Sequence, residues 1–162
     1  SLKEGERGDV WVKTPDVMAG YMKRPAETDK VLKGPWFRTG DIGFIKENKL
    51  FLVGRMRNEI NKGGIKISPE EIDIVLERHP AVAEACTFPI EDRILGEDIG
   101  VCIVMEDETV RPLQLANWVS TQLSDSKVPK NWYYVQDIPK TPRGKVNRSS
   151  VASFASSCTI TQ

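Results

Sequence analysis

Lys145 stands in a short basic segment near the C-terminal end of the chain, and the residue types around it could do chemistry. The segment reads Pro139-Lys140-Thr141-Pro142-Arg143-Gly144-Lys145-Val146-Asn147-Arg148. Turn-forming residues precede the lysine, and the adjacent glycine lets the backbone bend. Such a loop can carry one ammonium group to an anion bound on another surface. Most surface lysines are simply solvated, so the segment gains meaning only beside others.

Two upstream segments contain residue types that suit a nucleotide. Asp41 ends the run Phe37-Arg38-Thr39-Gly40-Asp41, and a carboxylate there could accept hydrogen bonds from the vicinal hydroxyls of a ribose. The alternative is a turn in which Asp41 caps its own backbone. In the next segment, the planar fork of Arg55 could hold a phosphate or ribose. Gly63-Gly64 would let a backbone approach a ligand closely, although a linker followed by a plain hairpin also explains this segment.

In this order and spacing, the three segments resemble the ANL superfamily, which comprises acyl- and aryl-CoA synthetases, adenylation domains of nonribosomal peptide synthetases and beetle luciferases. The quoted motifs are Phe-Arg-Thr-Gly-Asp, then Gly-Arg followed by Gly-Gly and Ser-Pro-Glu-Glu-Ile-Asp, then Pro-Lys-Thr-Pro-Arg-Gly-Lys. The likeness runs from about Gly5 to Phe154. Two positions depart from the family pattern: Arg57 stands where Asp or Lys is usual, and Gly34-Pro35 where Asp-Gly is common.

The resemblance implies a two-step reaction. A carboxylic acid attacks the α-phosphate of ATP to give an acyl-adenylate and pyrophosphate, and then the C-terminal domain swings and a thiol, usually that of CoA, displaces AMP. It implies that Lys145 is catalytic and bridges the α-phosphate and the substrate carboxylate. The remaining implied roles are ATP or AMP binding by Thr39, Asp41 and Arg55, a pantetheine passage at Gly63, Gly64 and Lys66, and a hinge at Arg57.

The resemblance also implies the domain organisation and the partners. Residues 1–53 would be the β-rich tail of the large N-terminal AMP-binding domain, and residues 54–162 the mobile C-terminal domain with the catalytic lysine. The cofactors implied are ATP, CoA and Mg²⁺, with the metal and the phosphate loop held by the remainder of the N-terminal domain. No metal site is expected in this chain. The cluster of Arg143, Lys145 and Arg148 is either a solvated face or a contact for the phosphates of CoA.

The residue pattern predicts an α+β fold, with a short sheet flanked by helices and an N-terminal hairpin. Residues 9–53 read mainly as strands, with a hairpin turn at Glu47-Asn48. Ser68-Pro69-Glu70-Glu71 is typical of a helix N-terminus, and Pro80 ends that helix. The further predicted elements are strands at 82–88, 99–105 and 132–135 and helices at 26–32, 112–123 and 149–155.

Composition narrows the class of protein. Among 162 residues, Lys+Arg and Asp+Glu are balanced at 23 each, so net charge predicts neither a nucleic-acid nor a membrane partner. No apolar run approaches a membrane span. The cysteines Cys86, Cys102 and Cys158 lack metal-ligand spacing; the first two are expected in the core. A cytoplasmic location, or an organellar matrix, fits.

Three functions compete. An AMP-forming acyl- or aryl-CoA ligase is favoured, because Lys62-Gly63-Gly64 followed by Pro69-Glu70-Glu71-Ile72 resembles CoA ligases. The second is an adenylation domain that loads a carrier protein. The third is a non-catalytic fragment acting as an interaction module. We expect a fragment of a longer protein that is inactive alone, because the family's Ser/Thr/Gly-rich phosphate loop and acid pocket are absent from these residues.

Overall fold

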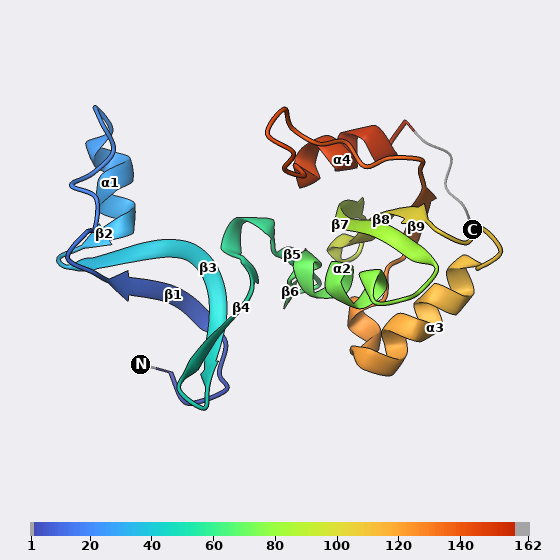
Figure 1. The fold of residues 1–162 in the computed structure, drawn as a ribbon, viewed down its shortest axis with the longest axis horizontal. Coiled ribbons are helices and arrows are strands. Elements are labelled where there is room, and N and C mark those ends of the chain that lie inside the picture. Colours follow the sequence, from blue (N-terminus) through green and yellow to red (C-terminus); the bar gives the residue numbers. More distant parts are fainter. Residues whose placement is uncertain (1, 158–162) are drawn as a thin grey trace. The chain divides into compact units, whose positions relative to one another are not determined.

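The computed structural model describes residues 2–157, and the chain divides into two compact units, Ser1–Arg57 and Asn58–Gln162. Both combine strands with helices, so the expected α+β class is confirmed (Figure 1). None of the helices within the described residues is long and apolar enough to cross a membrane.

The first unit is a small antiparallel sheet arranged around one long strand. Strand β3 (Trp36–Lys46) pairs with β1 (Gly8–Lys13), with β2 (Leu32–Lys33) and with β4 (Lys49–Arg55), while helix α1 (Pro25–Val31) precedes β2. Glu47 and Asn48 connect β3 to β4 and both have positive φ, 52° and 58°. Positive φ at both central residues is the geometry that matches the twist of a two-residue hairpin, and the predicted hairpin is confirmed.

This first unit buries little apolar surface. Among its described residues, Val10 is the only buried hydrophobic side chain. Phe44 and Phe51 stack across β3 and β4 with ring centroids 5.2 Å apart. Successive side chains of a strand point to opposite faces, and β4 carries exposed apolar residues on both of them: Leu50, Phe51 and Leu52.

The second unit contains a five-stranded sheet. Its order is β6 (Ile65–Ile67), β5 (Ile60–Lys62), β8 (Gly96–Met105) and β7 (Val82–Asp92), with β9 (Asn131–Tyr134) parallel to β8. Three helices, α2 (Pro69–Glu77), α3 (Pro112–Gln122) and α4 (Arg148–Ala155), accompany it. The 3-10 turn η2 (Asp125–Lys127) follows α3, and a second one, η1 (Met56–Asn58), spans the border of the units.

Successive side chains of β8 point to opposite faces of this sheet, and each face carries its own hydrophobic core. Val101 and Ile103 pack with residues of α2 and α3, whereas Cys102 packs with Val151 and Ala155 of α4. The helices therefore lie in separate layers, with α4 on the opposite face from α2 and α3 (Figure 1).

The prediction that Cys86 and Cys102 lie in the core is confirmed. Cys86 and Cys102 are buried, unbridged and directly opposite each other on β7 and β8. Cys158 lies outside the described residues.

Several element bounds differ from the sequence expectation for a physical reason. Strand β7 was expected to end at Phe88 and β8 to begin at Ile99, but the ladder continues through Glu91 opposite Glu97 to Asp92 opposite Gly96. Polar residues remain in a hairpin when their backbone groups are paired, even after the apolar run has ended. At the start of α2, the Ser68 hydroxyl donates to Glu70 Oε2 at 3.0 Å, so this side chain contacts a carboxylate.

The buried hydroxyl of Thr87 gives a stability prediction. Thr87 is fully buried on β7, and its Oγ1 has no hydrogen-bond partner among the described residues. An unmet buried polar group destabilises by about 1–3 kcal/mol. Thr87→Val keeps the shape and removes the hydroxyl, so it should raise the free energy of unfolding in urea by about 1 kcal/mol. Thr87→Ser keeps the hydroxyl and loses a methyl group, so it should lower this free energy. A lower stability for both variants would contradict the prediction.

Candidate functional site

Lys145 lies on a tight hairpin between β9 and α4. The N–H of Thr141 donates to the carbonyl of Lys145 at 2.8 Å, and the N–H of Gly144 donates to the carbonyl of Thr141 at 2.8 Å. Lys140 and Val146 form an isolated antiparallel bridge at its base. Gly144 has φ of 73°, a conformation that a residue with Cβ adopts only with strain. We call residues 140–146 the lysine hairpin.

Two cations near Lys145, those of Lys140 and Arg148, are paired within the unit, whereas Arg143 is exposed. Lys140 Nζ pairs with Glu84 Oε2 of β7 at 2.9 Å. Arg148 pairs with Glu70 and Asp73 of α2. Among residues 2–157, no carboxylate pairs with the exposed ammonium of Lys145. The lysine therefore remains available to an external anion.

Arg148 points inward, so neither interpretation of the basic cluster, as a solvated face or as a contact for the phosphates of CoA, describes it. Its Nη1 lies 2.7 Å from Asp73 Oδ2 and donates to the carbonyl of Thr87 at 2.7 Å. Its Nε lies 3.3 Å from Glu70 Oε1. Only 18% of the side chain is exposed. One guanidinium group thus binds two carboxylates and a strand carbonyl, a pattern that suits its rigid fork of donors.

Burial and charge shift the pKa values of this cluster. Burial raises the pKa of Asp73 to about 6, although the charge of Arg148 and the hydrogen bond from the backbone N–H of Thr87 act in the opposite direction. For Glu70, burial also acts upward, but the hydrogen bond from Asn58 and the charge of Arg148 hold its pKa below the ordinary value. Burial raises the pKa of the Cys86 thiol to about 12, so this cysteine is not a nucleophile at neutral pH.

In the first unit, the structure brings Asp41 and Arg55 together. They lie directly opposite each other on β3 and β4, and Arg55 Nε contacts Asp41 Oδ1 at 2.9 Å. Both side chains keep some exposure, 52% for Arg55 and 20% for Asp41. Thr39 holds the β3 backbone beside Asp41, because its hydroxyl donates to the carbonyl of Val10 and accepts the N–H of Asp41, each at 3.1 Å, so this segment is a strand and not the turn considered from the sequence. The pair presents a carboxylate and a guanidinium at one place on the sheet.

The Gly63-Gly64 turn is also strongly constrained. Both glycines have positive φ, 57° and 89°. The N–H of Gly63 donates to the carbonyl of Leu95 at 2.9 Å, and the N–H of Gly64 donates to Asn61 Oδ1 at 3.1 Å. A Cβ on Gly63 would lie 3.1 Å from the Leu95 side chain. The turn is therefore tied to the β7–β8 hairpin.

A buried ion pair supports this turn. Lys62 Nζ contacts Asp98 Oδ1 at 2.7 Å, with only 18% and 5% of the two side chains exposed. Lys66, in contrast, is 69% exposed and reaches Glu59 at 3.5 Å. Sequence reasoning missed the structural ion pairs of Lys62 with Asp98 and of Arg148 with Asp73. The available indication was an aspartate inside an apolar stretch, Asp73 after Ile72 and Asp98 before Ile99.

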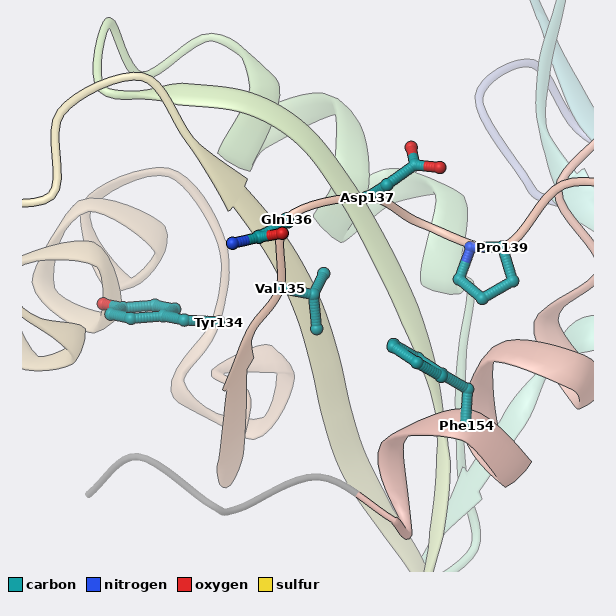
Figure 2. Close-up of a pocket in the computed structure, with 6 residues that line it drawn as sticks. All are labelled: Tyr134, Val135, Gln136, Asp137, Pro139 and Phe154. Atoms are coloured by element: carbon teal, nitrogen blue, oxygen red, sulfur yellow. The ribbon is translucent and has the colours of Figure 1, made fainter.

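An open depression of ≈ 500 Å³ lies beside the segment that leads from β9 to the lysine hairpin. Figure 2 shows Phe154 of α4 facing Val135 and Pro139 across it. The six residues that line it include none of the residues predicted to act on ATP, acid or CoA.

The described part of the chain has no cluster of protein ligands for a metal ion. Residues 2–157 contain no group of three or more His, Cys, Asp or Glu side chains that could hold one.

Comparisons with known proteins show the family to which the chain is related. The family model described as the AMP-binding enzyme C-terminal domain matches residues 71–145. The chain is 37% identical over 148 residues to the oxalate–CoA ligase of Arabidopsis thaliana, which covers 90% of this chain and 29% of that protein. It thus spans less than a third of that ligase.

Two solved structures are similar to the chain along most of its length. The amide bond synthetase McbA of Marinactinospora thermotolerans is 33% identical, with a TM-score of 0.89 over 95% of this chain and 32% of that one. The o-succinylbenzoate CoA synthetase MenE of Bacillus subtilis, in complex with an acyl-adenylate intermediate, is 28% identical, with a TM-score of 0.86 over 93% and 31%. The chain belongs to the ANL superfamily of adenylate-forming enzymes.

Proposed function

We propose that this chain is part of an AMP-forming acid–thiol ligase, which activates a carboxylic acid with ATP and transfers the acyl group to the thiol of CoA. The observation that carries the proposal is the lysine hairpin: a tight turn presents the unpaired ammonium of Lys145, while Lys140 and Arg148 are bound internally. The similarity to a CoA ligase and to a CoA synthetase supports the identity of the acceptor.

Lys145 suits the first half-reaction. The carboxylate and the α-phosphate are both anions, and their reaction develops further negative charge on a five-coordinate phosphorus. An ammonium fixed between them lowers this barrier electrostatically, because it needs no reorganisation as the charge develops. The oxygen of the acid forms a bond to phosphorus, and the bond from phosphorus to the pyrophosphate oxygen breaks.

Asp41 and Arg55 suit the nucleotide. The Asp41 carboxylate would accept hydrogen bonds from both ribose hydroxyls, and the Arg55 fork would contact the ribose or a phosphate. Their ion pair, 2.9 Å long, orients the carboxylate before ATP binds. Thr39 would act by holding the Asp41 backbone.

Two features support the proposed domain organisation, in which the first unit is the tail of a larger AMP-binding domain and the second is the mobile C-terminal domain. Strand β4 exposes apolar side chains on both faces, and contiguous exposed apolar surface is normally covered by further protein. The border of the compact units falls directly after Arg57, which supports a hinge at that residue.

The glycine turn suits the second half-reaction. At Gly63 and Gly64 the absence of side chains lets a narrow chain such as pantetheine pass close to the backbone. The exposed ammonium of Lys66, on the strand after the turn, could contact a phosphate of CoA. The thiol sulfur would then attack the acyl carbon, and AMP would leave with the electrons of the carbon–oxygen bond.

A second candidate is amide formation, in which an amine replaces the thiol. The similarity to an amide bond synthetase over 95% of this chain favours it. The two candidates differ only in the acceptor, so AMP release measured with CoA and with amines separates them.

Lys145→Ala should remove adenylation selectively. In the longer enzyme that carries this chain, we expect acyl-adenylate formation from ATP to fall by roughly 10² to 10³-fold, the loss typical of one electrostatic catalytic group. Thioester formation from supplied acyl-AMP and CoA should change by less than about threefold, because Lys145 acts only in the first step. ATP–pyrophosphate exchange and single-turnover thioester assays measure the two steps.

Arg143→Ala is the matched control, because it removes a neighbouring exposed cation from the same hairpin. It should leave adenylation within about twofold of the wild type, as expected for a charge remote from the reacting atoms. Equal loss of both half-reactions in Lys145→Ala would contradict the assigned role.

Asp41→Asn should weaken ATP binding. Loss of a charged hydrogen-bond acceptor is worth about 1.5–3 kcal/mol, so the KM for ATP should rise by roughly ten- to a hundredfold. Asp9→Asn is the control, because Asp9 forms an ion pair with Arg38 in the same sheet. An unchanged KM in Asp41→Asn, or an equal rise in both variants, would contradict a ribose contact.

A further inference from the structure

We propose that Arg148 is a positioning residue for Lys145, which joins the lysine hairpin to the start of the second unit and so fixes where the ammonium is presented. The inference rests on the proposed function of Lys145. It concerns an interior residue that contacts neither nucleotide nor acid.

The lysine hairpin is weakly held everywhere except at its C-terminal base. On the upstream side, the Lys140–Glu84 pair has exposed fractions of 40% and 26%, and ion pairs open to water contribute little. Val146, at the other end of the hairpin, is 39% exposed and is not part of the core. Arg148 follows two residues later, and 18% of its side chain is exposed. The firm attachment of the hairpin therefore begins at Arg148.

Arg148 connects three parts of the unit at once. It heads α4, contacts Asp73 and Glu70 on α2, and donates to the Thr87 carbonyl on β7. Asp73 completes the link, because its Oδ1 accepts the N–H of Thr87 at 2.7 Å. The hairpin, α2 and β7 are thereby fastened together by charged groups that are mostly shielded from water.

The cluster continues to the first residue of the second unit. Asn58 Nδ2 donates to Glu70 Oε1 at 2.7 Å, and the same oxygen lies 3.3 Å from Arg148 Nε. Asn58 directly follows Arg57, where the compact units divide. A contiguous path of hydrogen bonds thus runs from the proposed hinge through Glu70 and Arg148 to the base of the lysine hairpin.

This path would keep Lys145 in a fixed position relative to the hinge while the domain moves. A misplacement of about 1 Å can lower a rate by roughly 10²-fold, so the segment between the pivot and the reactive group must be stiff. Lysine cannot replace Arg148, because a single ammonium does not reach two carboxylates and a carbonyl in one plane. The glycine turn has its own support from Lys62 and Asp98, so the second half-reaction does not depend on this path.

The test compares Arg148→Lys and Glu70→Ala with Lys127→Met in the longer enzyme. Lys127 pairs with Glu71 of the same helix α2 at 2.7 Å, with exposed fractions of 18% and 20%, but it lies on η2 and not on the hairpin. Arg148→Lys and Glu70→Ala should each lower kcat for adenylation by roughly tenfold or more, with the KM for ATP and thioester formation from acyl-AMP within about twofold. Lys127→Met should leave both half-reactions within about twofold.

A double-mutant cycle adds a measurement that a merely structural role would not affect. In Lys145→Ala, the further change Arg148→Lys should produce no additional loss of adenylation, because the group that Arg148 positions is already absent. Equal losses in both half-reactions, additive losses in the cycle, or unchanged adenylation in both variants would overturn the inference. If Arg148→Lys does not fold, Glu70→Ala decides by the same criteria.

The single variant Lys145→Ala separates this inference from the proposed function. If Lys145→Ala fails to impair adenylation selectively, the proposed function is wrong. If it does impair adenylation selectively and Arg148→Lys and Glu70→Ala do not, only the role of Arg148 is wrong.

Discussion

The buried ion pair between Arg148 and Asp73 is the interaction on which the second unit most depends. Removing one partner of such a pair leaves an uncompensated charge and destabilises by about 3–5 kcal/mol, a large share of the 5–15 kcal/mol that stabilises a typical domain. Asp73 also binds the Thr87 backbone, and Arg148 begins α4. The pair therefore determines how α2, β7 and α4 meet, and with them the base of the lysine hairpin.

The second unit uses one sheet to hold two different loops. Strand β8 lies between β5 and β7 and is buried along most of its length, so it provides a rigid frame. The glycine turn is tied to the hairpin between β7 and β8, and the lysine hairpin is tied to α2 and β7. Each loop has its own buried ion pair, which lets the two proposed half-reactions be positioned independently.

Much of this architecture could be predicted from the sequence because it follows from local rules. A continuous non-polar run from Ile99 to Met105 indicates β8, Pro69 marks the start of α2, and Glu47-Asn48 indicates a hairpin turn. The Gly-Gly and Gly-Lys segments likewise identify positions that only a residue without a side chain occupies easily. Strand ends were less predictable, since Glu91 and Glu97 remain in the ladder through backbone pairing that side-chain type does not reveal.

The sequence by itself determined which residues are candidates for chemistry, since Asp41, Arg55, Gly63, Gly64 and Lys145 stand in motifs that together resemble those of one family. Only the tertiary structure decided which charges are free to act. Arg148 and Lys145 are equally basic in the sequence, yet one is bound by Asp73 and the other is exposed. The physical reason is that a charge is compensated by groups distant along the chain, 75 residues away for Arg148 and Asp73 (148 − 73), and no local pattern specifies that meeting.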